Sequence, residues 1–367
     1  MKIALKILWL SPNLNHYKAK FLNYLASESE LEVTVLSGSG RLGKGDVEFN
    51  QDSVFKHFSL QVLKKDFGKS KKVKLFLKKH LSEFDWVMIP AEKKNLPLFL
   101  FLLKFRNNRS NFKLFSYNHP ILKSKGGRIT YLDKWLTKFY FKKLDRVIFY
   151  TKQSYEWALS EKLIIKDKAF WANNTIDTLE IDKYYNYTLP SKDKLYILFI
   201  GRLIPSKRLS DLISYYQKLK ESIPELSLDI IGDGPEVKIV KSALELEPNI
   251  NLHGTIVDES KIAPIMKRSS LVFIPGHSGL SVNHAFAYGR PYVTLAGPRH
   301  APEVDYIDNG KNGYILDGDF ESNINLIKDL ILNRDVLELF CDSAKEKGND
   351  LSIENWVDQM KQNLLHE

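Results

Sequence analysis

Two cations near residue 200 stand at a spacing that suits a pair of phosphoryl groups. Arg202 directly follows an apolar run that ends at Gly201, and Lys207 stands where the next helical pattern begins. A guanidinium fork and an ammonium group can neutralise adjacent phosphoryl oxygens, and a helix N-terminus adds its positive end. The spacing therefore indicates a diphosphate ligand, while two solvated loop charges remain the plainer interpretation of these residues alone.

A second loop, at residues 275–281, combines small residues with the start of a short helix. Small residues permit close approach of the backbone, and the first amides of a helix can donate to phosphate or sugar oxygens. His284 lies one turn into that helix, on the face of Ser281. A tight turn capped by Ser281, with a packed histidine, fits the sequence equally well. The residues of this turn that we assign to binding are Gly276, Ser278, Gly279, Leu280 and Ser281.

A β-sheet is needed to position these two loops, and the second half of the chain has the sequence pattern of such a sheet. Apolar runs alternate with amphipathic stretches, which predicts a parallel sheet covered by helices, with ligands bound at the carboxyl ends of the strands. The predicted strands begin at Tyr196 and continue at 226–232, 249–255, 270–276, 290–295 and 313–316. The predicted helices cover 207–221, 235–246, 258–268 and 281–289.

The first half of the chain repeats this alternation. Strands are predicted at 2–10, 31–38, 84–90, 112–118 and 145–151, with a helix at 16–28. The apolar run at 96–105 is about half of the roughly 20 residues that a membrane span needs, so we expect a buried helix there. A chain of 367 residues usually forms more than one core. The predicted fold class is α/β, with two doubly wound, Rossmann-like domains facing each other across a cleft.

Composition shifts place the domain boundaries. We predict an N-terminal domain over 1–185 and a C-terminal domain over 195–350, joined by the polar segment 183–194. The closing helix at 351–367, which contains Trp356, is expected to pack back toward the N-terminal domain.

The cysteine content and the first residues of the chain indicate the cellular compartment of the protein. The single cysteine, Cys341, excludes an intramolecular disulfide and a thiolate zinc site. The opening apolar stretch is interrupted by Lys6 and lacks a small-residue cleavage site, so it is predicted to be a buried strand. We therefore expect a cytoplasmic protein, with peripheral attachment to the cytoplasmic membrane face as a further possibility.

Charge is distributed unevenly along the chain. Residues 1–180 hold 33 Lys and Arg against 17 Asp and Glu, a net charge of +16, whereas the remainder holds 21 against 27, a net charge of −6. The cations gather at 64–79 and 123–143. Such a surface attracts anionic lipid headgroups or nucleic acid, and it can also be a solvated face.

The order of motifs in the second half resembles the C-terminal domain of the retaining, GT-B-fold glycosyltransferases of family 4. The series runs through GRL with a following lysine, GDGPE, the glycine turn, a short helix that ends in GxP, then PE and an NG turn, and it covers most of 196–315. The resemblance implies a hexosyltransferase that moves a sugar from a nucleotide diphosphate sugar to a glycan or lipid-linked acceptor. It also implies retention of configuration, a place in polysaccharide or lipopolysaccharide biosynthesis, and no cofactor or metal.

The same resemblance implies roles for particular residues. Arg202 and Lys207 would hold the diphosphate, with Gly201, Gly232, Gly234 and Thr255 among the donor-binding residues. Family members carry two glutamates eight positions apart, and here Gly276 and His284 stand at those positions. His284 can hydrogen-bond a ribose hydroxyl but supplies no carboxylate. Glu303 offers a carboxylate nearby in the sequence.

Similarity in the first half is thinner and rests mainly on SYNHP, DRVIFYT and ANNTID. His119 matches a histidine that the family places beside the donor sugar, and we assign it a catalytic role; a loop histidine that caps local backbone is the alternative. The loop Ser11–Tyr17 replaces the family's glycine-rich first loop and is expected to shape the acceptor side. If the chain transfers sugars, we expect its basic surface to face a membrane rather than nucleic acid or solvent alone. Phe67, Leu75 and Phe76 are then expected to add interfacial contacts.

Two other motifs are expected to be structural. Gly38–Gly43 matches the dinucleotide fingerprint but starts no helix, so we expect a flexible loop. Asp317 and Asp319 are expected to form a solvated turn.

Two other functions stay open: a glycosyltransferase-like protein that binds a nucleotide or glycan without turnover, and a nucleic-acid binder. The basic stretches contain no nucleic-acid motif, so we expect no nucleic-acid partner.

Overall fold

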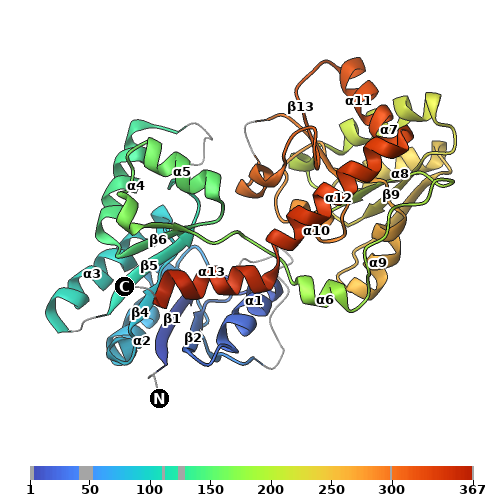
Figure 1. The fold of residues 1–367 in the computed structure, drawn as a ribbon. Helices are drawn as coiled ribbons and strands as arrows, with labels where there is room; N and C mark the ends of the chain where they lie inside the picture. Colours follow the sequence, from blue (N-terminus) through green and yellow to red (C-terminus); the bar gives the residue numbers. More distant parts are fainter. Residues whose placement is uncertain (1–3, 41–52, 110–111, 123–128, 298–299, 366–367) are drawn as a thin grey trace. The chain divides into compact units, whose positions relative to one another are not determined.

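The computed structural model describes residues 4–40, 53–109, 112–122, 129–297 and 300–365 (Figure 1). It contains two compact units of similar size. The N-terminal unit comprises residues 1–173 and 353–367, and the C-terminal unit comprises residues 174–352. Each unit holds one parallel sheet with helices packed on it, which confirms the predicted fold class of two doubly wound α/β sheets.

The sheet of the N-terminal unit has seven strands in the order β3-β2-β1-β4-β5-β6-β7. Its inner strands are buried along most of their length, as expected for strands covered on both faces. The strands are β1 (Leu5–Ser11), β2 (Leu31–Ser37), β3 (Lys56–Ser59), β4 (Trp86–Met88), β5 (Lys113–Asn118), β6 (Arg146–Phe149) and β7 (Ala169–Trp171). The two edge strands, β3 and β7, are absent from the sequence-based prediction.

Helices cover both faces of this sheet. On one face, α2 to α5 share an apolar core with the strands, and the predicted buried helix at 96–105 is the first part of α3. Elsewhere α13 packs beside α1, and the Trp356 ring lies 4.7 Å from that of Phe21. The helices are α1 (His16–Ala26), α2 (Lys71–His80), α3 (Leu96–Arg109), α4 (Tyr131–Lys143), α5 (Lys152–Ser160) and α13 (Ile353–Leu365). No helix among the described residues is long and apolar enough to cross a membrane.

The sheet of the C-terminal unit has six strands in the order β10-β9-β8-β11-β12-β13. All six strands match predicted ones. They are β8 (Tyr196–Ile200), β9 (Ser227–Ile231), β10 (Ile250–Gly254), β11 (Leu271–Phe273), β12 (Tyr292–Leu295) and β13 (Gly313–Leu316). The helices are α6 (Thr178–Asp182), α7 (Leu209–Ser222), α8 (Val237–Leu246), α9 (Glu259–Arg268), α10 (Ser281–Ala287), α11 (Phe320–Leu332) and α12 (Arg334–Asp350).

The segment expected to link the domains is bound to the C-terminal unit. Tyr185 is buried, and its hydroxyl accepts a hydrogen bond from the fully buried Arg290 guanidinium, which also donates to the Thr188 carbonyl oxygen at 2.8 Å. A buried guanidinium needs such acceptors. The boundary between the units therefore falls at Asn173 and Asn174, before the polar segment 183–194.

Three other predictions from the sequence can be compared with the structure. Phe67, expected at an interfacial surface, has no exposed area and packs in the core of the N-terminal unit, so that interpretation was wrong. Asp319 caps α11 by accepting from the Ser322 amide. Of the fingerprint-like segment Gly38–Gly43, residues 41–43 lie outside the described ranges.

Candidate functional site

The C-terminal sheet has a switch point beside its central strand. The chain proceeds from β8 to β9 on one side, and β11 occupies the other side of β8. The loops that follow β8 and β11 therefore leave the carboxyl edge in opposite directions, and open α/β sheets bind ligands at such a crevice. Both predicted sets of binding residues, Arg202 with Lys207 and the turn at 275–281, follow these two strands.

Lys207 connects these two loops. Its ammonium group donates to the His277 carbonyl oxygen at 2.5 Å, and Nζ lies 3.7 Å from the position that a Cβ on Gly201 would take. The His277 amide donates in turn to the Ser206 carbonyl oxygen at 2.7 Å. The cation is thus held over the ends of the two neighbouring strands.

Arg202 and Lys207 form a cationic pair. Burial and the positive charge of Arg202 lower the pKa of Lys207 to about 8. Neither side chain forms an ion pair with a carboxylate of the described residues. Because two like charges meet here without a resident counter-ion, the site favours an anion.

Glycines let the loops of this edge pack closely against one another. A Cβ on Gly276 would lie 2.2 Å from the Ser206 carbonyl oxygen, and one on Gly232 would lie 1.9 Å from that of Gly201. A Cβ on Gly234 would lie 2.4 Å from the Leu203 carbonyl oxygen. These predicted donor-binding glycines therefore place one loop against the next.

The turn before α10 presents free backbone donors. The amides of Gly279, Leu280 and Ser281 have no hydrogen-bond acceptor within the described ranges, and no side chain caps α10. Ser281 therefore does not act as the cap that we considered. The hydroxyls of Ser278 and Ser281 instead bond to the Tyr292 hydroxyl, at 3.0 and 2.8 Å. The backbone amides are therefore the donors in this turn that a ligand could pair with directly.

His284 has a carboxylate partner that sequence analysis missed. Its Nε2 lies 3.1 Å from the carboxylate of Glu259, and the Tyr288 hydroxyl donates to the same carboxylate at 2.8 Å. Glu259 begins α9, just after the exposed Thr255 at the end of β10. The carboxylate absent from position 284 is therefore present beside it in space.

Glu303 lies beside the glycine turn. Its Oε1 accepts from the side-chain Nδ2 of Asn174 at 2.5 Å, and its Oε2 has no hydrogen-bond partner among the described residues. The same Oε2 lies 3.8 Å from the position of a Cβ on Gly279. Burial raises the pKa of this carboxyl group. A buried acceptor of this kind is costly to leave unpaired.

His119 belongs to the N-terminal unit. It is exposed and follows β5 at the carboxyl edge of that sheet, where its ring meets the Tyr150 ring edge-on at 5.0 Å. The side-chain Nδ2 of Asn118 donates to the His119 carbonyl oxygen at 2.5 Å. His119 is thus at the edge where a parallel sheet binds ligands, as the site residues of the C-terminal unit are in theirs.

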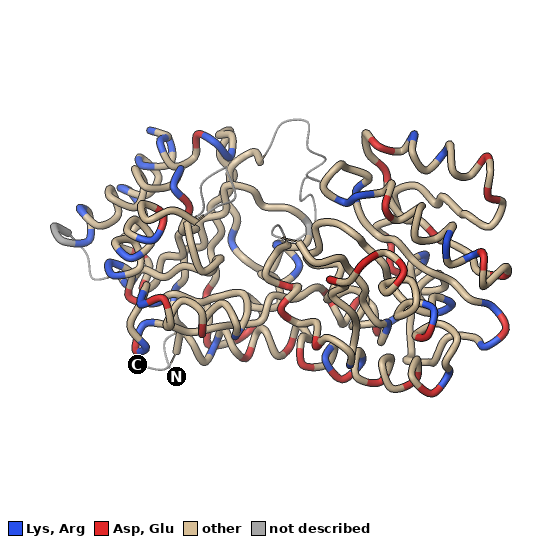
Figure 2. The backbone as a smooth tube through the Cα atoms, turned by 90° about the horizontal axis from the view of Figure 1, so that it is seen from above, with Lys and Arg blue, Asp and Glu red and all other residues tan. Residues whose placement is uncertain are grey.

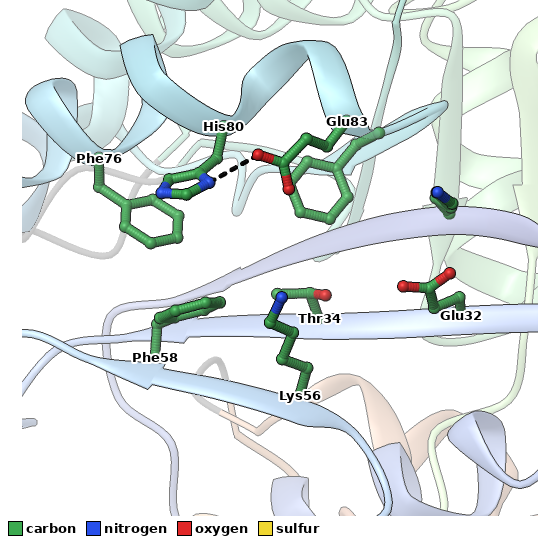
Figure 3. A pocket seen from close by; sticks show the side chains of 9 residues that line it. Glu32, Thr34, Lys56, Phe58, Phe76, His80 and Glu83 are labelled. Atoms are coloured by element: carbon green, nitrogen blue, oxygen red, sulfur yellow. Dashed lines mark hydrogen bonds and ion pairs between the residues drawn. The ribbon is translucent and has the colours of Figure 1, made fainter.

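The N-terminal unit also holds a small pocket, at the edge of its sheet opposite to that of His119 (Figure 3). It is lined by side chains near the amino ends of β1, β2 and β3, including Lys6, Glu32 and Lys56, together with His80, which bonds to Glu83 at 2.7 Å. Its volume of about 30 Å³ suits a water molecule rather than a sugar or a nucleotide. We therefore leave it out of the candidate site.

The fold is that of the GT-B glycosyltransferases. The chain superposes on a glycosyltransferase from Rickettsia africae with a TM-score of 0.72 at 16% identity, covering 99% of this chain and 100% of the other. Sucrose-phosphate synthase from Thermosynechococcus elongatus gives 0.71 at 15% identity, covering 98% of each chain. Anabaena Alr3699/HepE, solved with UDP and glucose, gives 0.68 at 15% identity, covering 98% of this chain and 99% of HepE.

Sequence comparison finds a family match in the C-terminal unit. Residues 180–348 match the family described as "Glycosyl transferases group 1". A GDP-mannose-dependent alpha-mannosyltransferase of Corynebacterium glutamicum is 28% identical over 177 residues, 47% of this chain and 40% of that protein. The uncharacterized glycosyltransferase MJ1059 of Methanocaldococcus jannaschii is 26% identical over 232 residues, 57% of this chain and 56% of that protein. The chain thus spans about half the length of the curated relatives it matches.

Proposed function

We propose that this chain is a glycosyltransferase that moves a sugar from a nucleotide diphosphate sugar to a glycan or lipid-linked acceptor. The cationic pair Arg202 and Lys207 carries the proposal, because it lies at the switch point of the C-terminal sheet without a carboxylate partner among the described residues, in the region that matches the group 1 glycosyltransferase family. The GT-B fold, shared with a protein solved with UDP and glucose, supports a nucleotide-sugar donor.

In the proposed reaction the bond from the anomeric carbon to the diphosphate oxygen breaks, and a bond to an acceptor hydroxyl oxygen forms. The acceptor hydroxyl loses its proton, and the nucleoside diphosphate leaves with the bonding electron pair. Arg202 and Lys207 would stabilise the charge that develops on the diphosphate, without a metal ion. The amides of residues 279–281 would bind phosphate or sugar oxygens, and His119 would contact the sugar.

Finer features of the proposal come from the resemblance. We infer a hexosyl donor, retention of anomeric configuration and membership of family 4. The name "Exopolysaccharide phosphotransferase", borne by a Streptomyces coelicolor relative, supports a role in cell-surface polysaccharide assembly. We infer that His284, together with Glu259, binds the ribose. The basic N-terminal unit supports a place at the cytoplasmic face of a membrane, with an anionic surface as partner.

A non-catalytic relative that only binds a nucleotide or glycan is the second candidate. The packing of Gly276 favours it, because the sugar-facing glutamate of the family cannot be accommodated there. Turnover separates the two functions. We expect slow release of nucleoside diphosphate from the cognate nucleotide-sugar without acceptor, measured by anion-exchange chromatography, and no release by the Arg202→Ala/Lys207→Ala variant. Tight binding with no release over a day would favour the non-catalytic function.

Binding of the diphosphate should depend on the protonation of Lys207. Its pKa of about 8 means that the free protein loses this positive charge as the pH rises from 7 to 9. The terminal phosphate is already ionised in this range, because its second pKa is about 6. We expect nucleoside diphosphate to bind about tenfold more weakly at pH 9 than at pH 7. Lys207→Arg keeps its charge throughout, so its calorimetric profile should be flat; equally steep profiles would contradict the assignment.

A further inference from the structure

One helix of the N-terminal unit exposes large apolar side chains together. On α4, Tyr131 is 85% exposed, Leu132 64% and Trp135 56%, and Ile129 just before the helix is 42% exposed. The rings of Trp135 and the half-buried Phe139 stack nearly parallel, 6.1 Å apart. Single exposed apolar residues are ordinary, whereas a group such as this indicates an interaction surface.

The helix that carries this group is firmly fixed to the unit. Thr130 and Asp133 form a capping box at its start, and Asp133 also pairs with Lys93. On its inner side the Tyr140 ring stacks on Phe99 at 3.7 Å, and Phe141 is fully buried. The exposed face is therefore preformed and needs no local unfolding to meet a partner.

Lysines continue the apolar group along the same face of the helix. Positions 131, 135, 138 and 142 follow the spacing of one helical face. Lys138 and Lys142 are exposed, and neither pairs with a carboxylate in the part of the chain that the structure describes. Figure 2 shows Lys and Arg along the helices of this unit. Helix α2 of the same unit contains five lysines and no acidic residue, and its Leu75 is exposed.

We propose that this face of α4 docks on an anionic lipid bilayer. Tyr131, Leu132 and Trp135 would enter the boundary between headgroups and acyl chains, where amphipathic aromatic rings are favoured. Lys138 and Lys142 lie on the same line and would reach the lipid phosphates. The proposal deepens the proposed function by naming the surface that meets the membrane, and it does not depend on sugar transfer.

The lysines alone would suit a nucleic acid, but the apolar group decides between the partners. Lipid binding uses both parts of the face, because the rings and Leu132 leave water while the ammonium groups meet phosphate. A nucleic acid would use mainly the lysines, so its binding would survive loss of Leu132. The two partners therefore predict different responses to apolar substitutions on α4.

Vesicle flotation tests the proposal with phosphatidylcholine vesicles that contain about 30% phosphatidylglycerol, beside pure phosphatidylcholine. We expect the wild-type chain to float with the anionic vesicles and to stay behind with the neutral ones. Tyr131→Ser/Leu132→Ser/Trp135→Ser and, separately, Lys138→Glu/Lys142→Glu should each lower the vesicle partition coefficient at least tenfold. The matched control is Leu246→Ser/Leu339→Ser in the C-terminal unit, where the two leucines are 76% and 67% exposed; it should float like the wild type.

Other outcomes would overturn the proposal. Equal flotation on both vesicle types would exclude the electrostatic part, and unchanged flotation of the serine variant would exclude α4. If the wild-type chain does not float but binds a single-stranded oligonucleotide, the lysines of α4 would be assigned to nucleic-acid binding instead. Nucleoside diphosphate binding serves as the folding control, because all α4 variants should retain it. A wild-type chain that floats with anionic vesicles but neither binds nucleoside diphosphate nor releases it from a nucleotide-sugar would contradict the proposed function and leave the docking proposal intact.

Discussion

Alanine at both Arg202 and Lys207 is expected to abolish measurable binding of nucleoside diphosphate. Each side chain would make a charge-assisted contact with the diphosphate, worth about 1.5–3 kcal/mol. Each single variant should therefore bind roughly 10 to 150 times more weakly, and the double variant more weakly still. The two effects need not add, since both cations contact one ligand. Isothermal titration calorimetry of the four proteins measures this directly.

Controls separate charge from loop packing. Lys207→Gln can still donate to the His277 carbonyl oxygen but has no charge, so it should bind as weakly as Lys207→Ala. Arg208 is the neighbouring cation and pairs with Asp211. Arg208→Asn suits its left-handed backbone (φ 59°) and should bind normally. Full affinity in both Arg202→Ala and Lys207→Ala would remove the assignment.

Replacement of Gly276 is expected to lower both stability and nucleoside diphosphate binding, even when the new residue is the glutamate that the family carries at this position. A Cβ there would lie 2.2 Å from the Ser206 carbonyl oxygen and 2.6 Å from the carbonyl carbon of Lys207, and backbone cannot yield as a flexible side chain does. The loops must separate, at a cost of about 1–3 kcal/mol. We expect Gly276→Ala and Gly276→Glu to melt several degrees lower and to bind nucleoside diphosphate as weakly as the Lys207 variants.

Gly279→Ala is the matched control in the same turn. The nearest atom to its new Cβ would be that of Ala301, at an ordinary contact distance of 3.4 Å. Its melting temperature should change little. A Gly276→Glu protein that folds normally and turns over donor faster than the wild type would contradict this packing. It would show instead that the missing glutamate limits the reaction.

The C-terminal sheet was predictable because its strands are buried apolar runs separated by glycine turns. Each run from Tyr196 to Leu316 became a strand of the sheet. The edge strand β3 escaped prediction because it is four residues long, largely exposed and contains Lys56 and His57. Its strand conformation depends on pairing with β2, which a local pattern cannot show.

Several contacts at the candidate site could not be predicted from the sequence, because they depend on tertiary packing. Glu259 and His284 stand 25 residues apart on different helices, and no spacing rule joins them. Gly276 was visible as a departure from the family, but its cause, the carbonyl oxygen of Ser206, is a contact between two loops. Similarly, Tyr185 lies in a polar segment typical of linkers, and only the buried Arg290 shows why it is bound.

Calorimetric titration with UDP, GDP, dTDP and ADP in the presence of EDTA tests the central claim most directly. We expect one base to be preferred, binding without metal, and the corresponding nucleotide-sugars then define the donor. That binding should disappear in the Arg202→Ala/Lys207→Ala variant. Absence of binding by all four nucleotides, in a protein that melts cooperatively, would contradict a diphosphate site at the β8 and β11 loops.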